Sequence, residues 1–341
     1  MDGRERDGEI VVDGDARQRF HDARGYGRPL DGDSLALTRV EAAHLLFRGD
    51  LVSVDGRGFR EFLSDAEAGF APRFLVYKDL RDRGFYLSPA REGWVTDPRD
   101  DVDFVVYPRG KGPWDEDVLY RIRAVGERAP VSAAGVGDCV LAVVDEESDI
   151  TYLQTAEPTP TGGTEYTPPS DVSGTLLDDR AVLWDPPEDL HHRGFYGRPL
   201  EGRDESADSP LQLSLIEAAY LAAEGALSLD LRRVVERGRA VEGDRFDRRL
   251  RTYRALRDGG LVPKTGFKFG ADFRVYATVE TVDDLGHAEF LVRVLPADYD
   301  FEPRDLALDV RLAHGVRKEM LFARHGDGER PSWLSVSRLT P

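Results

Sequence analysis

Three side chains in the C-terminal part of the chain could act together in acid–base chemistry. Tyr276 is a phenol, His287 an imidazole and Lys318 an ammonium, and each lies in a different segment. A phenol and an imidazole can take up or give up a proton, and an ammonium can stabilise negative charge that develops during a reaction. Lys318 is one of five lysines in a chain that otherwise uses arginine, which suggests that a point charge on a flexible stem is needed there.

A strand pair is expected to bring the phenol and the imidazole together. Apolar and polar residues alternate over 273–278 and again over 290–295, which predicts two strands, and residues 283–286 (DDLG) predict a turn between them. In such a hairpin Tyr276 and His287 lie close, because directly opposed Cβ atoms are roughly 5 Å apart.

A helix and a further strand are expected to carry the lysine. Leu306, Val310 and Ala313 fit one helix face, and Gly315 is suited to end that helix. Residues 316–323 then predict a strand that contains Lys318.

The chain contains an internal repeat. Four short motifs occur twice in the same order, 169 to 176 residues apart. The first copies cover residues 25–30, 40–45, 77–82 and 103–107, and the second copies cover 195–200, 216–221, 253–258 and 272–276. Four collinear matches predict a fused tandem duplication.

The repeats are expected to be joined by a flexible linker and to divide once more. Residues 158–174 are rich in proline, glycine and threonine and lack apolar periodicity, which predicts a connection. Each repeat begins with a helical pattern and continues as strands, so the fold class is α+β or α/β, with an N-terminal α/β subdomain and a C-terminal mixed-sheet subdomain. The expected divisions are 1–70, the degenerate catalytic-like 71–157, the linker, 175–250 and the catalytic 251–341.

The composition describes an acidic globular protein. The net charge is −18, from 64 acidic and 46 basic residues, which resembles proteins of salt-loving archaea. The single cysteine excludes an internal disulfide and fits a reducing cytoplasm. Residues 1–20 are charged and carry no secretory signal, and no run approaches the roughly 18 apolar residues of a membrane span. Net charge alone would argue against a nucleic-acid partner.

Three motifs in the second repeat overrule that argument from charge. The stretches KFGADFRVY (268–276), HAEFLV (287–292) and RLAHGVRK (311–318) resemble those of the tRNA-intron endonuclease family. The family takes its catalytic tyrosine, histidine and lysine from these motifs, and the repeat resembles the archaeal form in which each chain holds two fused units. The resemblance covers residues 20–341 and is strongest over 264–323.

The resemblance implies a reaction and a substrate. The chain is expected to cut precursor tRNA at both splice sites of a bulge-helix-bulge by attack of a ribose 2′-hydroxyl, which gives 2′,3′-cyclic phosphate and 5′-hydroxyl ends. Tyr276 is then the base, His287 the acid and Lys318 the group that stabilises the phosphorane charge. The reaction in this family needs no metal and no cofactor. The resemblance also implies a homodimer in the cytoplasm. The alternatives are a metal-dependent nuclease and a non-catalytic RNA-binding or assembly subunit; the intact triad argues against both.

Further residues follow from the resemblance. Arg311 and Trp333 match positions whose flat side chains grip a flipped bulge base, although Trp333 could equally be a core residue. In the first repeat, residues 115–117 replace the histidine and Asp138 replaces the lysine, so this repeat is expected not to cleave. Its acidic hairpin tip is expected to dock into a basic pocket of the partner chain, with an ordinary solvated turn as the alternative. The tip carries Asp145, Glu146, Glu147 and Asp149.

Overall fold

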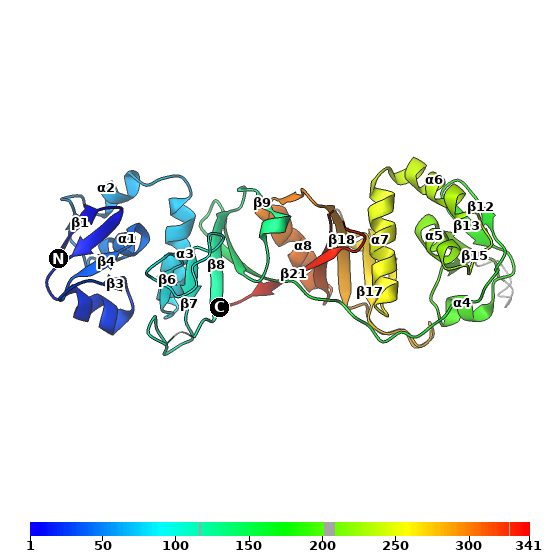
Figure 1. Ribbon diagram of the computed structural model, residues 1–341, viewed down its shortest axis with the longest axis horizontal. Helices are drawn as coiled ribbons and strands as arrows, with labels where there is room; N and C mark the ends of the chain where they lie inside the picture. Colours follow the sequence, from blue (N-terminus) through cyan, green and yellow to red (C-terminus); the bar gives the residue numbers. More distant parts are fainter. Residues whose placement is uncertain (116, 201–208, 327) are drawn as a thin grey trace. The chain divides into compact units, whose positions relative to one another are not determined.

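The chain forms two compact units that both mix helices with β-sheets. The computed structural model describes residues 1–115, 117–200, 209–326 and 328–341. Unit 1 comprises residues 1–156, 300–308 and 337–341, and unit 2 comprises 157–299 and 309–336. The expected mixture of helices and several sheets is therefore present (Figure 1).

Unit 1 begins with a small sheet packed against helices. Its elements are β1 (Asp2–Arg6), β2 (Glu9–Val12), the π-helix η1 (Arg17–Asp22), β3 (Arg28–Pro29), β4 (Leu35–Leu37), α1 (Arg39–Phe47), β5 (Ser53–Val54), α2 (Phe59–Ser64) and α3 (Phe70–Asp82). The strand order is β3-β4-β2-β1-β5.

Unit 1 continues as a mixed sheet in the order β6-β7-β8-β10-β11. Its elements are β6 (Leu87–Pro89), β7 (Phe104–Val106), β8 (Tyr120–Gly126), β9 (Val131–Ser132), the short helix η2 (Ala133–Gly135), β10 (Val140–Val144) and β11 (Ile150–Ala156), with β19 (Asp300–Phe301) paired to β9. Because β8 and β10 are parallel and the other pairs antiparallel, the expected mixed sheet is present.

Unit 2 also begins with a small sheet packed against helices. Its first part has β12 (Thr175–Leu176), β13 (Arg180–Leu183), α4 (Glu188–His192), β14 (Arg198–Pro199), β15 (Leu211–Ser214), α5 (Leu215–Ala223), α6 (Leu231–Glu242) and α7 (Arg245–Asp258). Its second part has β16 (Val262–Thr265), η3 (Phe267–Phe269), β17 (Phe273–Tyr276), β18 (Phe290–Pro296), the second half of α8 (Pro303–Gly315), β20 (Glu319–His325) and most of β21 (Ser332–Leu339). The strands pair in the order β16-β17-β18-β20-β21.

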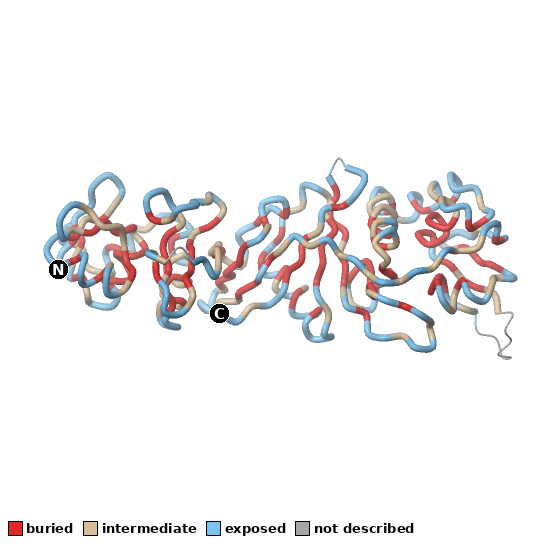
Figure 2. Tube along the Cα trace, turned by 60° about the horizontal axis from the view of Figure 1, so that its bottom comes forward, coloured by how far each residue is buried: buried red, intermediate tan, exposed pale blue. Residues whose placement is uncertain are grey.

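Each unit buries its own apolar core between its sheets and helices. The interior strands and the inner faces of the helices are buried, whereas the outer helix faces and loop tips are exposed (Figure 2). Since this burial removes apolar surface from water, it supplies the main free energy that holds each sheet and its loops in place.

The same buried glutamate organises the start of both units. Thr38 and Ser214 are N-caps, and the third residue of each helix is a glutamate, Glu41 or Glu217. One carboxylate oxygen accepts hydrogen bonds from the backbone N–H and the hydroxyl of the N-cap, as in a capping box. The other oxygen accepts from Gly27 N–H at 2.7 Å in unit 1 and from Gly197 N–H at 3.0 Å in unit 2.

The segment expected to be a flexible linker is hydrogen-bonded to unit 2 in its central part. Its backbone makes hydrogen bonds from Gly162 and Thr164 to the glycine pair that follows α7, at 2.8 and 3.0 Å. Proline and glycine content predicted a turn-rich connection, but an extended segment with no internal ladder can still pair with backbone groups of a neighbouring loop.

Candidate active site

The three predicted catalytic residues lie at one edge of the unit 2 sheet. Tyr276 is the last residue of β17, and the end of β17 meets the start of its antiparallel neighbour β18. β20 runs parallel to β18, with Glu319 opposite Phe290, so the starts of β18 and β20 also lie side by side. His287 and Lys318 come shortly before these two strands. Tertiary pairing thus gathers three segments that are far apart in the sequence.

Tyr276 is held by aromatic packing at this edge. Its side chain is only 4% exposed and belongs to a small cluster with Phe195, Val262, Val279 and Ala288. The Phe195 ring packs edge-on against it at 5.6 Å between ring centroids, and the Arg274 guanidinium lies 5.7 Å from the Tyr276 ring centroid. Such packing fixes the direction of the phenol and places a cation beside it.

His287 lies in a long loop rather than directly after a tight hairpin turn. The expected turn is present at Asp283 and Asp284, but residues 277–289 connect β17 to β18 without strand structure. The register places Glu289 opposite Tyr276, and the Glu289 N–H donates to Val275 O at 2.9 Å while its carboxylate accepts from the Ala277 N–H at 2.7 Å. His287 is two residues away and its side chain is exposed.

A helix of the N-terminal part of unit 2 also holds this loop. The Val282 N–H donates to His192 O at 2.8 Å, and His192 Nε2 lies 2.9 Å from an Asp283 carboxylate oxygen. His192 is the last residue of α4, so the loop that carries His287 is anchored from outside the sheet.

Lys318 reaches the histidine loop directly. Its Nζ donates to Ala288 O at 2.6 Å, one residue beyond His287. The side chain is half-buried, and its ammonium lies 6.0 Å from the Phe269 ring centroid. Lys318 stands immediately before β20 rather than inside the expected strand, because α8 ends at Gly315 and Arg317 turns the chain with φ 57°.

Arg311 and Trp333 lie on different elements of unit 2. Arg311 is exposed on α8, whereas Trp333 is half-buried and packs against the unit 2 core. Trp333 lies opposite Ala323 on β20, five residues along the chain from Lys318. At roughly 3.3 Å per residue, this separation is about 16 Å, so the structure does not bring Trp333 next to the lysine of its own chain.

The acidic tip is confirmed as a hairpin turn between β10 and β11. The Asp145 carboxylate accepts hydrogen bonds from the Glu147 and Asp149 N–H groups, both at 2.9 Å, so this side chain holds the turn together. Glu146 pairs with Arg128. Glu147 and Asp149 are exposed at the tip.

A cavity of about 780 Å³ adjoins the catalytic edge of unit 2. Its wall includes Phe195, Phe269 and Arg274, the residues that contact Tyr276 and Lys318. Among the described residues, six arginines and lysines line it, against three acidic residues. The basic residues are Arg180, Arg198, Arg249, Lys264, Lys268 and Arg274, and the acidic residues are Asp179, Glu217 and Glu242.

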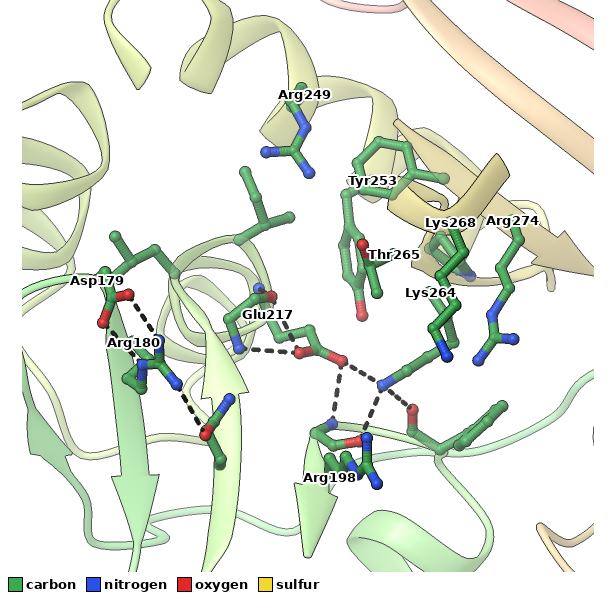
Figure 3. Close-up of a pocket in the computed structure, with 18 of the residues that line it drawn as sticks. Asp179, Arg180, Arg198, Glu217, Arg249, Tyr253, Lys264, Thr265, Lys268 and Arg274 are labelled. Carbon is green, nitrogen blue, oxygen red and sulfur yellow. Dashed lines mark hydrogen bonds and ion pairs between the residues drawn. The ribbon is translucent and has the colours of Figure 1, made fainter. Parts of the chain in front are cut away.

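A buried ion pair closes one wall of this cavity (Figure 3). Lys264 Nζ donates to Glu217 at 2.7 Å and to the carbonyls of Phe195 and Gly197 at 3.0 Å. Burial alone would raise the pKa of Glu217, but the Lys264 ammonium and the donated hydrogen bonds outweigh it and lower that pKa to about 2. The carboxylate therefore stays ionised at neutral pH.

Three cations of the wall have no such partner in the part of the chain that the structure describes. Within the described ranges, no ion pair joins Arg198, Lys268 or Arg274 to a carboxylate, whereas Arg180 pairs with Asp179 and Arg249 with Glu242. This basic cavity was not predicted from the sequence. Its signal was the pair of lysines at 264 and 268 in a chain with only five.

The corresponding edge of unit 1 carries different side chains. The strand registers place Tyr107 at the position of Tyr276 and Asp117 at the position of His287. They place Gly137, rather than the expected Asp138, at the position of Lys318. The one-residue error arose because α8 in unit 2 is replaced by the three-residue η2 in unit 1. At neither of these two positions does unit 1 have an imidazole or an ammonium.

Over the described ranges the chain has neither a cluster of metal-binding side chains nor a helix that could span a membrane. No group of three or more His, Cys, Asp and Glu side chains there could hold a metal ion. Helices of that part of the chain are all too short or too polar to cross a membrane.

Comparisons with known proteins identify similar sequences over the full chain. Residues 246–330 match a model described as tRNA intron endonuclease, catalytic C-terminal domain, and residues 1–63 and 172–236 both match the N-terminal domain model of that family. Proteins named tRNA-splicing endonuclease are 61% identical in Halobacterium salinarum and 59% identical in Haloferax volcanii, with all of both chains covered. One from Methanosarcina mazei is 38% identical over 92% of each chain.

Proposed function

The chain belongs to the tRNA intron endonuclease family, and we propose that it cuts precursor tRNA at both splice sites of a bulge-helix-bulge. The observation that supports the proposal is that the segments carrying Tyr276, His287 and Lys318 lie at one sheet edge, where Lys318 Nζ donates a hydrogen bond to the carbonyl of Ala288. A precursor tRNA substrate places the enzyme in the cytoplasm, and the acidic composition fits the halophilic relatives.

The chemistry that these groups support is an intramolecular transesterification, in which a ribose 2′-hydroxyl attacks the adjacent phosphodiester. Tyr276 takes the 2′ proton, the oxygen attacks the adjacent phosphorus, and His287 gives a proton to the leaving 5′ oxygen. The Lys318 ammonium stabilises the negative charge on the phosphorane. The products are a 2′,3′-cyclic phosphate and a 5′-hydroxyl, and no metal or cofactor enters the route. A phenol is a weak base near neutrality, so a neighbouring cation is needed to favour its ionised form.

Cleavage in the presence of EDTA tests this chemistry. Purified protein should cut a bulge-helix-bulge RNA twice in excess EDTA, and end-group analysis should find cyclic phosphate and 5′-hydroxyl termini. His287→Ala should give no product, while Asp117→Ala, at the matching position of unit 1, should cut normally. Dependence on added metal, or persistent cutting by His287→Ala, would reject the mechanism. RNA binding without any cutting by the unaltered protein would favour a non-catalytic subunit.

We further propose that the chain is a tandem duplication with the boundaries expected above, and that unit 1 is a non-cleaving copy. The two matches to one N-terminal domain model and the repeated Glu41 and Glu217 hydrogen bonds support the duplication. Asp117 and Gly137, at the positions of His287 and Lys318, support loss of cleavage from unit 1.

A homodimer would give two active edges, one for each cut. We propose that Glu147 and Asp149 of one chain enter the basic cavity of the other. There they would form ion pairs with Arg198, Lys268 and Arg274. Opposite charges within about 4 Å attract more strongly where water is excluded than at an open surface. Asp145 and Glu146 have structural partners and would shape the tip.

Charge reversal tests the dimer contact. Glu147→Lys with Asp149→Lys should halve the mass found by sedimentation and reduce cleavage, and Lys268→Glu in the same chain should restore part of both. The control, Glu92→Lys with Asp100→Lys, makes the same change in net charge at exposed sites of unit 1 and should remain dimeric. A dimer that survives the tip reversal would contradict this contact.

Arg311 and Trp333 are proposed to contact RNA by stacking. The exposed guanidinium on α8 and the half-buried indole on β21 are both flat groups suited to an unstacked base. Because Trp333 lies about 16 Å along the sheet from Lys318, its base is not the one at the phosphate cut by the same edge.

A further inference from the structure

The segment between the repeats is laid along unit 2 as an extended strap. From residue 158 to residue 168, even-numbered residues are half-buried and odd-numbered ones are exposed. A period of two is the pattern of an extended chain with one face against a surface. We name residues 162–164 the strap.

The strap bonds on one side to the end of α7. The Gly162 N–H donates to Gly259 O at 2.8 Å, and the Thr164 N–H donates to Gly260 O at 3.0 Å. These glycines follow α7 and precede β16, the strand beside β17. The strap is therefore fixed to a rigid part of unit 2.

On its other side the strap bonds to the loop that follows Tyr276. The Gly163 N–H donates to Ala277 O at 2.8 Å, and Thr164 Oγ1 accepts from the Val279 N–H at 2.9 Å. Ala277 is the first residue of the 277–289 loop, and Val279 packs in the cluster that holds the Tyr276 ring. Two of the first three loop residues are thus held by a segment from outside the catalytic sheet.

The approach at Gly162 is too close for any side chain. A Cβ at this position would lie 2.3 Å from Ala277 O and 2.5 Å from Gly260 O. Both are backbone atoms that cannot rotate away. At Gly163, in contrast, a Cβ would meet only the end of the Thr278 side chain, at 3.1 Å. The fit is specific to one glycine.

We propose that the strap is a positioning element for the catalytic loop 277–289, which carries His287. The proposal rests on the proposed function, because it assigns the strap to that same reaction. A simple tether between repeats needs no hydrogen bonds to the loop after Tyr276. Holding both ends of the loop, through the strap at Ala277 and Val279 and through Lys318 at Ala288, limits where His287 can move. Catalytic groups misplaced by about 1 Å can lose about 100-fold in rate.

The test compares Gly162→Ala with Gly163→Ala and Thr164→Val. Gly162→Ala should lower kcat for a bulge-helix-bulge RNA by about 10- to 100-fold, with KM and RNA affinity close to those of the unaltered protein. Thr164→Val, which removes one acceptor, should lower kcat several-fold and speed hydrogen exchange at the Val279 amide. Gly163→Ala should match the unaltered protein in both readouts.

The rate of cleavage and the hydrogen exchange at Val279 together distinguish a positioning strap from a simple tether. Unchanged kcat and unchanged Val279 exchange in both Gly162→Ala and Thr164→Val would overturn the proposal, as would a rate loss shared equally by Gly163→Ala. If Gly162→Ala fails to fold, Thr164→Val carries the test. If the unaltered protein cuts no RNA, the proposed function fails, and hydrogen exchange still shows whether the strap holds the loop.

Discussion

The buried glutamates of the two units make the same backbone hydrogen bonds but have different third partners. In unit 1, Glu41 accepts from the Trp94 indole N–H at 3.1 Å, and burial raises the pKa of its carboxyl. In unit 2, Glu217 accepts from Lys264, and its pKa falls to about 2. The strand registers place Ser88 at the position of Lys264. Similar backbone hydrogen bonds thus hold a glutamate that is bonded to an indole in unit 1 and a glutamate that is paired with an ammonium in unit 2.

The same change extends to the sheet edge. In unit 1 the Tyr107 hydroxyl donates to Ser88 Oγ at 3.1 Å, and burial raises the pKa of this phenol. In unit 2 the residue at the Ser88 position, Lys264, donates a hydrogen bond to Glu217. Tyr276 instead packs in the small cluster that contains Phe195. The comparison teaches that the scaffold alone does not make an active site. Chemistry depends on a few side chains at the edge and on the loops that hold them.

The largest expected difference between the units is in the rate of cleavage. Tyr276→Phe should lower the single-turnover rate by about 10²- to 10⁴-fold, because it removes the proton acceptor. Tyr107→Phe should leave the rate unchanged, since this hydroxyl serves Ser88. Similar losses from the two changes would mean that unit 1 takes part in the chemistry.

The next largest effect concerns stability. Lys264→Met leaves the Glu217 carboxylate buried without its cation and should lower the free energy of unfolding by about 3–5 kcal/mol. Ser88→Ala, at the same position of unit 1, removes one neutral hydrogen bond and should cost about 1 kcal/mol. Denaturant unfolding measures both, and equal costs would show that the third partner of the glutamate does not matter.

The pH dependence of stability should also differ. The folded pKa of Glu217, about 2, lies below the ordinary value of 4.5, so its contribution is complete above about pH 4.5 and is lost as the pH falls toward 2. The difference between these two pKa values corresponds to roughly 3 kcal/mol of free energy of unfolding, at 1.36 kcal/mol for each pKa unit. Glu217→Gln should therefore flatten the fall in Tm between about pH 4.5 and 2.

Glu41→Gln provides the control of opposite sign. Because the folded pKa of Glu41 is raised, its ionisation lowers stability as the pH rises above the ordinary value of 4.5, and the glutamine should remove that loss. Parallel pH profiles of Tm for the two variants would contradict the opposite directions of the two pKa shifts.

The smallest expected effect is on RNA binding. Arg311→Ala should weaken binding of a bulge-helix-bulge RNA about tenfold, which is within the range of about 1–3 kcal/mol for one stacked base. Arg304→Ala, an exposed arginine of the same helix, should have a smaller effect. Equal weakening by the two would leave only a general charge effect, which added salt should then remove.

Local patterns predicted most elements around the site. Alternation predicted β17 and β18, and the apolar spacing before Gly315 predicted α8, which spans Pro303–Gly315. The acidic tip was predicted because two apolar strands flank it. These features depend on neighbouring residues in the sequence, and periodicity reports them directly.

Features that depend on distant contacts could not be predicted. Nothing within residues 277–289 shows that the loop is held by His192 and by the strap. Glycine and proline in 158–174 indicated a connection, but whether it docks depends on free backbone groups elsewhere. The bond from Lys264 to Glu217 joins residues 47 positions apart, and neither motif contains its partner.

Non-additivity of the triad tests the central claim most directly. Single-turnover rates should be measured for Tyr276→Phe, Lys318→Ala and the double variant. If the two groups act on one phosphate, the double variant should be only slightly slower than the slower single variant, because either change already disables the shared step. A double variant whose loss equals the product of the two single losses would show that they act independently, and would contradict a single active edge in unit 2.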